Sequence, residues 1–128
     1  MKKSSKKSIM LIEDDLTLVE MYKEKLKNSG YRVLTVTDSK LAMQRIRTGA
    51  DLILLDILMP NLNGFEVLKR VKSDEKTKHI PVIVLTNIGS ESIDNDKKLA
   101  FSLGAIDYMI KSLNTPESIV QKIESVLN

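Results

Sequence analysis

Apolar residues along the chain fall into two alternating kinds of pattern. Five short continuous runs, rich in valine, isoleucine and leucine, recur along the sequence at Ile9–Ile12, Val33–Val36 (with Tyr31), Leu52–Leu55, Val82–Leu85 and Tyr108–Ile110. Continuous runs, as opposed to alternating ones, are typical of strands that are buried on both faces of a parallel sheet. We therefore expect five parallel strands, each buried on both faces.

Between these runs, the apolar residues follow helical spacing. The stripes consist of Leu18, Val19, Tyr22 and Leu26; Ala42 and Ile46; Phe65, Leu68 and Val71; and Ile119, Val120, Ile123, Val126 and Leu127, with a weaker stripe at Leu99, Ala100 and Leu103. Helix ends are marked by glycines that can adopt the left-handed conformation, at Gly30, Gly49 and Gly104. Thr115 and Pro116 mark the start of the last helix. A strand followed by a helix, repeated five times, predicts a three-layer α/β sandwich.

Composition narrows the class of protein. A chain of 128 residues, of which 42% are hydrophobic and 29% charged, is expected to fold as a single domain. No apolar run approaches the length of a membrane span. Cysteine is absent and there is one histidine, which excludes a disulfide framework, thiolate metal sites and multi-histidine metal sites. Because the lack of cysteine fits a reducing compartment, a cytoplasmic location is expected.

The net charge of +3 comes largely from the start of the chain, where four lysines fall within the first seven residues. We interpret residues 1–7 as a basic, disordered and solubilising tail, so nucleic-acid and membrane contacts are not expected. The apolar run Ile9–Ile12 is too short for a secretory signal. Residues 8–128 are expected to form the domain, with no output domain after the last helix.

Candidate chemistry gathers where the predicted strands end. Glu13 and Asp14 follow the first strand, Asp56 the third, Thr86 the fourth and Lys111 the fifth. In open parallel sheets, ligands bind beyond the carboxyl ends of the strands. We therefore expect these side chains to meet at one edge of the sheet. Asp15, in contrast, is expected to cap the first helix.

Three carboxylates at one place repel each other unless a cation lies between them. Oxygen ligands without histidine or cysteine favour Mg²⁺, although the acids could also be solvated loop residues. A carboxylate held at the end of a buried strand, as expected for Asp56, can attack phosphorus and become an acyl phosphate. Lys111 and Thr86 could then contact the phosphoryl oxygens.

These residues carry a resemblance to a known family. Glu13-Asp14, the stretch Asp56-Ile57-Leu58-Met59-Pro60 with Gly64, Thr86, and Tyr108-Met109-Ile110-Lys111 together resemble a response regulator receiver domain of two-component signalling, of the chemotaxis (CheY-like) type, over residues 8–127. The resemblance implies a doubly wound α/β fold that is flavodoxin-like. Its five-stranded parallel sheet would have the order 2-1-3-4-5 and be flanked by five helices.

The resemblance also implies a role for each site residue. It implies that Asp56 is the phosphoacceptor and that Lys111 and Thr86 contact the phosphoryl group. It also implies that Mg²⁺ is bound by Asp14, Asp56 and the backbone carbonyl of Leu58, with Glu13 contacting the ion through a water molecule. Tyr108 would be the switch aromatic. A histidine kinase or phosphotransfer protein would donate the phosphoryl group. The surface of the fourth helix, fifth strand and fifth helix would then bind an unidentified downstream protein, and a homodimer stays open. Such a domain is not an enzyme beyond its own phosphorylation and slow dephosphorylation.

Two departures from the family pattern leave an alternative open. Asn87 stands where a small residue is usual, and Ser112 stands where a proline, often with a cis bond, is usual. The alternative is therefore a receiver-like binding module that signals without phosphorylation. A haloacid-type phosphatase lacks its general acid, because that position is Leu58, and a flavin-binding module lacks its glycine-rich phosphate loop. Apolar Leu58 and Ile88 cannot orient a water, which predicts a slowly hydrolysing acyl phosphate.

Overall fold

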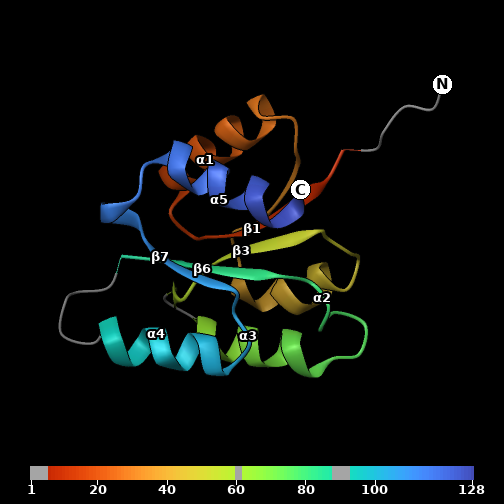
Figure 1. The fold of residues 1–128 in the computed structure, drawn as a ribbon. Helices are drawn as coiled ribbons and strands as arrows, with labels where there is room; N and C mark the ends of the chain where they lie inside the picture. The colour runs from red at the N-terminus through yellow and green to blue at the C-terminus, as the bar shows by residue number, and fades with distance from the viewer. Residues whose placement is uncertain (1–5, 60–61, 88–92) are drawn as a thin grey trace.

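The computed structural model describes residues 6–59, 62–87 and 93–128. A five-stranded parallel sheet runs through the middle of the molecule (Figure 1). Its strands are β1 (Ser8–Ile12), β2 (Arg32–Val36), β3 (Leu52–Asp56), β6 (Val82–Thr86) and β7 (Asp107–Ile110). They lie in the order β2-β1-β3-β6-β7, which confirms the predicted order 2-1-3-4-5 and the doubly wound α/β class.

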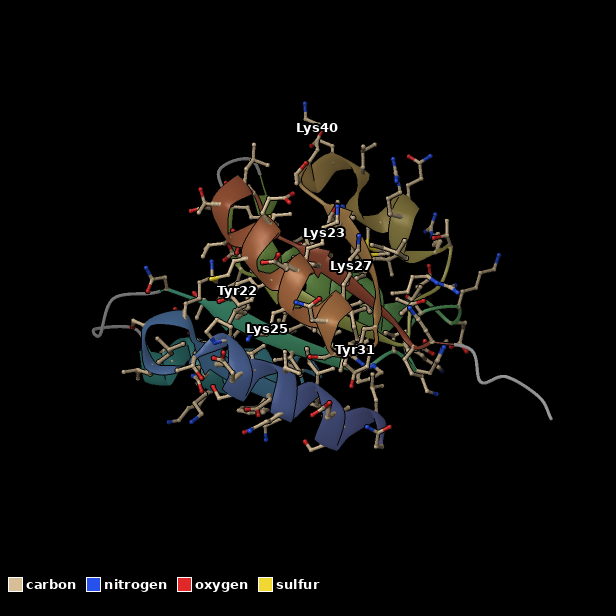
Figure 2. The ribbon with its side chains drawn as sticks, turned by 90° about the horizontal axis from the view of Figure 1, so that it is seen from above. Tyr22, Lys23, Lys25, Lys27, Tyr31 and Lys40 are labelled. Carbon is tan, nitrogen blue, oxygen red and sulfur yellow. The ribbon has the colours of Figure 1, made fainter. Side chains whose placement is uncertain are left out.

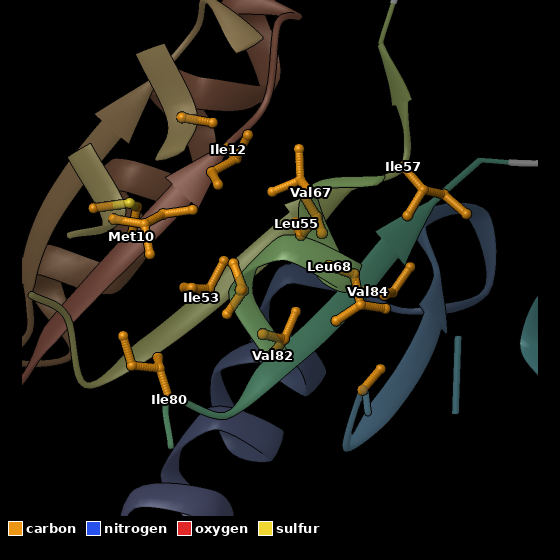
Figure 3. Close-up of a cluster of buried hydrophobic side chains, with 14 of the residues drawn as sticks. Met10, Ile12, Ile53, Leu55, Ile57, Val67, Leu68, Ile80, Val82 and Val84 are labelled. Atoms are coloured by element: carbon orange, nitrogen blue, oxygen red, sulfur yellow. The ribbon is translucent and has the colours of Figure 1, made fainter. Parts of the chain in front are cut away.

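Helices cover both faces of the sheet. They are α1 (Leu16–Asn28), α2 (Ala42–Ile46), α3 (Gly64–Ser73), α4 (Ile93–Ser102) and α5 (Pro116–Leu127), with short 3-10 turns at Ser39–Leu41 and Lys111–Leu113. In Figure 1, α1 and α5 lie on one face, and α2, α3 and α4 on the other. The core is accordingly split by the sheet into two apolar clusters. Figure 3 shows the cluster on the α2–α4 face, where Met10, Ile53 and Val82 of three strands pack beside Leu68 of α3.

The predicted helix ends are confirmed. Asp15 caps α1, because its Oδ1 accepts the backbone N–H of Thr17 at 3.0 Å. Thr115 caps α5 in the same way, with Pro116 as the first helical residue. Gly104 has φ +109° after α4, a conformation that side chains with a Cβ rarely adopt. These caps and glycines fix where each helix begins and ends, and so where the neighbouring strands end and begin.

Three details of the prediction were wrong. β2 is an edge strand and not a strand buried on both faces, so Leu34 is 37% exposed. In the weak stripe of α4, Ala100 is buried but Leu99 is 42% exposed, because it faces away from the sheet. The stretch after Asp56 is not a plain loop, since β4 (Leu58–Met59) and β5 (Leu62–Asn63) pair as a small antiparallel ladder.

Some predictions fall outside the described residues. They concern residues 1–5 of the basic tail, Pro60 of the motif, and Ile88. The described chain has no cis peptide bond, so the bond between Lys111 and Ser112 is trans. Among the described helices, none is long and apolar enough to cross a membrane.

Candidate functional site

The parallel register brings the ends of the central strands together. Glu13 directly follows β1, and its backbone N–H donates to the Val36 carbonyl of β2 at 3.1 Å. Asp56 is the last residue of β3, which lies beside β1 on one side and β6 on the other. The side chains that follow these strands therefore share one edge of the sheet, as predicted from the sequence.

Three carboxylates meet at this edge. Oxygen atoms of Glu13, Asp14 and Asp56 all lie within 4.8 Å of one another. Glu13 is only 1% exposed and Asp56 5%, while Asp14 is half-buried. Ionised acids at such distances repel each other strongly when little water separates them. The cluster therefore requires positive charge nearby.

Lys111 supplies part of that charge. Its Nζ lies 2.7 Å from Glu13 Oε1 and 3.4 Å from Asp56 Oδ2, and the lysine side chain is 12% exposed. Burial by itself would lower the pKa of Lys111, but its hydrogen bond to Glu13 and the negative charge of Asp56 outweigh that cost, so the pKa lies above its usual value. Lys111 thus stays protonated, one cation against three acids.

The donor set fits a hard divalent cation. Carboxylate oxygens without a nitrogen or sulfur ligand are the donors that Mg²⁺ prefers. An added cation would also offset the repulsion among the three carboxylates. Leu58, whose carbonyl was predicted as a further ligand, lies in β4 two residues beyond Asp56. Its role stays a prediction.

Thr86 and Tyr108 form a second part of the site. Both are buried, and neither Thr86 Oγ1 nor the Tyr108 hydroxyl has a hydrogen-bond partner among the described residues. Thr86 pairs with Ile110, and Tyr108 with Val84. Because side chains alternate along a strand, Thr86 and Tyr108 lie on the same face of the sheet. Burial, reinforced by the charge of Asp96, raises the pKa of Tyr108.

A glycine lets α3 begin close to Asp56. The Gly64 N–H donates to the Ile57 carbonyl at 3.1 Å, and Asn63 caps the helix by accepting from Phe65 N–H at 2.9 Å. A Cβ on Gly64 would overlap the Cα of Ile57 and lie 2.9 Å from the Asp56 carbonyl oxygen. The absence of a side chain here therefore keeps the turn after β3 tight.

Sequence reasoning missed one residue near the site. Tyr22 was predicted only as a core residue of the first helix, and it is indeed buried. Burial raises its pKa, and its phenol also lies within electrostatic reach of Lys111, Glu13 and Asp56. Helical spacing predicts that Tyr22 faces the core, but only the packing of α1 against β2 and α5 places it within electrostatic reach of the acids. His79, in contrast, is exposed and has no part in the site.

Comparison with known sequences supports one family. The profile of the response regulator receiver domain matches residues 9–124. Transcriptional regulatory protein CpxR of Klebsiella pneumoniae is 39% identical over 119 residues, which cover 93% of this chain and 48% of CpxR. The chain thus spans about half the length of such curated relatives.

Solved structures agree with this result. Chemotaxis protein CheY4 of Vibrio cholerae superposes with a TM-score of 0.85 at 26% identity, covering 96% of this chain and 100% of that one. The phosphorylated cyanobacterial phytochrome response regulator RcpA superposes with a TM-score of 0.79 at 32% identity, covering 95% and 91%. The sequence match, the strand order and the acidic edge of the sheet lead to one conclusion: the chain belongs to the response regulator receiver domain family, the phosphoacceptor signalling domains of two-component systems.

Proposed function

We propose that Asp56 is the phosphoacceptor and that a histidine kinase or phosphotransfer protein is the donor. The observation that carries this proposal is the position of Asp56: buried at the end of β3, within 4.8 Å of two further carboxylates and 3.4 Å from Lys111. Glu13 and Asp14 share the environment but not the position, because they follow β1 and not the strand next to Thr86.

The proposed step is an in-line displacement. A carboxylate oxygen of Asp56 forms a bond to phosphorus, while the bond from phosphorus to the donor's imidazole nitrogen breaks and its electron pair stays on that nitrogen, which takes up a proton. Lys111 then pairs with a phosphoryl oxygen in place of part of its contact with Asp56. The Thr86 hydroxyl, which lacks a partner within the described chain, donates to another phosphoryl oxygen.

Mg²⁺ would be held by Asp14, Asp56 and the carbonyl of Leu58, with Glu13 acting through a metal-bound water. When bound, the ion would neutralise charge on the phosphoryl group during transfer. The chain's own contribution is to hold the acids together before the donor arrives. Lys111 keeps Glu13 in position through its 2.7 Å contact, and Glu13 Oε2 also accepts the Asp15 N–H at 3.1 Å.

Phosphorylation of Asp56 would change the surface of α4, β7 and α5 through movements of Thr86 and Tyr108. If Thr86 turns toward the phosphoryl group, the space that it leaves on the α4 face accepts the Tyr108 ring, and the surface of α4, β7 and α5 changes. Leu99 and Phe101 are exposed on α4, where a downstream protein could contact them. We place this exchange in the cytoplasm, where cysteine-free composition and a kinase donor both fit.

The experiment is phosphorylation of the chain with acetyl phosphate, followed by intact-mass measurement. We expect one added phosphoryl group in the presence of Mg²⁺, little with EDTA, and none in Asp56→Asn. Asp15→Asn is the matched control, because Asp15 is an adjacent acid that caps α1 and asparagine also caps helices. Equal labelling of Asp56→Asn, or no labelling of the wild type, would favour the binding module that signals without phosphorylation.

The same assay tests how long the acyl phosphate lasts. The side chain two residues after Asp56 is apolar Leu58, which cannot orient a water for attack on phosphorus. We therefore propose slow hydrolysis, with the label stable for minutes or longer after the phosphodonor is removed. Loss of the label within seconds, without any added phosphatase, would refute this.

A further inference from the structure

The outer edge of β2 carries backbone groups that face away from the sheet. Within the described chain, β2 pairs only with β1. The Arg32 N–H donates to the Lys7 carbonyl at 2.9 Å, and the Val36 carbonyl accepts from Glu13 N–H at 3.1 Å. Because alternate residues of a parallel strand bond to the same neighbour, the N–H and C=O groups of Val33 and Thr35 point outward. This edge is a template for another strand.

One side of the edge is apolar. Leu34 lies opposite Met10 in the register, which puts its side chain on the face that α2 covers. The helix α2 has only five residues and leaves this end of the sheet partly open. Leu34 is 37% exposed and Leu41, in the turn before α2, is 39% exposed. Leu34 therefore offers an apolar contact at the open edge, and Leu41 is exposed in the turn that follows β2.

The other side of the edge is basic. Lys25 of α1 pairs with Glu117 of α5 at 2.7 Å, so that flank of the helix faces α5. Helical spacing puts Lys23 and Lys27 on the opposite flank, toward β2. Figure 2 shows Lys23 and Lys27 on the side of α1 away from α5, with Lys40 on the same side of the molecule.

These cations have no acidic partners in the described structure. None of the ion pairs formed by the described residues includes Lys23, Lys27 or Lys40. The exposed acids of α1, Glu20 and Glu24, lie one turn before Lys23 and Lys27, and helical spacing turns both acids farther toward solvent than the lysines. A second copy of this chain would bring like charges together at the edge, whereas an acidic segment would be attracted to it.

We propose that the β2 edge binds an extended, acidic segment of a partner protein, which adds to the sheet as a further strand. Lys23 and Lys27 are one helical turn apart, about 6 Å along the axis. Residues i and i+2 of a strand are separated by about 6.7 Å, so acids at alternate positions match the two lysines. The intervening apolar residues would then contact Leu34 and Leu41. Main-chain hydrogen bonds would supply the affinity, and the alternating side chains the specificity.

This surface is separate from the phosphoacceptor's output. β2 and β7 are the two opposite edges of the sheet. A partner on β2 would therefore leave α4, β7 and α5 accessible, so that the domain could be held by one protein while it signals to another. The proposal does not depend on whether Asp56 is phosphorylated.

The probe is a fluorescein-labelled peptide of alternating glutamate and leucine, titrated with the wild-type chain and followed by fluorescence anisotropy. Its control is the same peptide N-methylated at alternate amides, which keeps every charge but cannot form the strand ladder. We expect saturable binding of the first peptide and at least about tenfold weaker binding of the second. Amide exchange at Val33 and Thr35, measured by NMR, should slow when the first peptide is bound.

Two charge-reversed variants locate the binding surface. Lys23→Glu/Lys27→Glu should weaken binding by at least about tenfold, whereas Lys97→Glu/Lys98→Glu, an equal change in net charge on exposed α4, should change it by less than about threefold. Equal loss in both variants, equal binding of the N-methylated peptide, or unchanged exchange at Val33 would overturn the proposal. The proposal would also be overturned if a DNA oligonucleotide or an anionic vesicle bound this surface while the acidic peptide did not. If a variant does not fold, the wild-type measurements decide alone.

Discussion

At the scale of single residues, the site combines buried charge with unused hydrogen-bonding capacity. Glu13 and Asp56 are almost completely buried, and Lys111 contacts both. Thr86 and Tyr108 are also buried, and their hydroxyl groups lack partners among the described residues. Both features cost stability, because buried charge and buried hydroxyl groups without a partner lose their hydration on folding.

Replacing Lys111 by methionine should lower the free energy of unfolding, because the buried acids then lose their positive partner. The side chain keeps a similar volume but no longer compensates two buried carboxylates. We expect a loss of about 2–3 kcal/mol in the free energy of unfolding, measured with urea in the presence of EDTA. Mg²⁺ should recover a larger part of this loss than it adds to the wild type, because the acids are then less compensated. The idea fails if Lys111→Met is as stable as the wild type in EDTA.

Replacing Thr86 by valine should have the opposite effect on stability. Valine has nearly the same shape but removes a buried hydroxyl that has no partner in the described chain. We expect the free energy of unfolding to stay the same or rise by about 1 kcal/mol, while phosphorylation no longer changes the near-ultraviolet spectrum of Tyr108. Urea denaturation and circular dichroism measure the two effects. A clear loss of stability would mean that the hydroxyl is hydrogen-bonded.

At the scale of elements, much of the fold follows from local signals. The five strands of the main sheet are predicted by continuous apolar runs. The helices that flank it are predicted by apolar stripes, by the caps at Asp15 and Thr115, and by the glycines that follow helices. The edge position of β2 followed from the strand order that the family resemblance implies and not from its apolar run, because such a run has the same pattern whether or not another strand lies beside it. The small β4–β5 ladder was missed since it depends on a turn and on Gly64, and not on periodicity.

The candidate site was predictable for a related reason. The carboxyl ends of parallel strands meet at one edge, so Glu13, Asp14, Asp56 and Lys111 could be grouped from their positions after predicted strands. The involvement of Tyr22 could not be predicted in this way. It comes from a helix, and its distance to the acids depends on how α1 packs over the sheet.

Gly104 and Gly30 allow a matched test of how α4 ends. Both have positive φ, +109° and +97°, but a Cβ on Gly104 would lie 2.9 Å from Cγ of Lys72, whereas one on Gly30 would meet nothing within 4 Å. Gly30→Ala should therefore cost only the backbone strain, about 1 kcal/mol, and Gly104→Ala about 1–2 kcal/mol more. Urea unfolding gives both values. Equal losses would show that Lys72 moves aside freely.

Asp74 should make the free energy of unfolding fall as the pH becomes acidic. The backbone N–H of Lys76 and the side chain of Arg47 donate to its carboxylate at 2.9 and 3.1 Å, which holds the pKa of Asp74 below its usual 3.8. A lowered pKa stabilises the fold above the unfolded value of about 3.8, and this contribution is lost as the pH falls through the lower, folded value. Asp74→Asn should thus be less stable than the wild type at pH 7.

The difference between Asp74→Asn and the wild type should shrink as the pH falls below about 3.8. Urea midpoints at several pH values measure it. Glu24→Gln, which changes an exposed acid on α1, is the control and should follow the wild type. If the difference between Asp74→Asn and the wild type is independent of pH, the carboxylate has no stabilising role.

At the scale of the whole molecule, the sheet would keep the three proposed functions apart in space. Asp56, the proposed phosphoacceptor, lies with Glu13 and Asp14 at the carboxyl ends of the central strands. The surface of α4, β7 and α5 lies at one edge of the sheet, and the basic edge of β2 lies at the other. The surfaces proposed for accepting a signal, passing it on and binding a partner at β2 therefore do not overlap.

The most direct test is to locate the phosphoryl group chemically. The chain is phosphorylated with acetyl phosphate and Mg²⁺, reduced with borohydride, which converts an aspartyl phosphate to homoserine, and digested for tandem mass spectrometry. We predict homoserine at position 56 alone, abundant with Mg²⁺ and strongly reduced with EDTA or after Lys111→Met. Homoserine at position 14, a reduced product at Glu13, or a product at position 56 that forms equally well in EDTA would contradict the account.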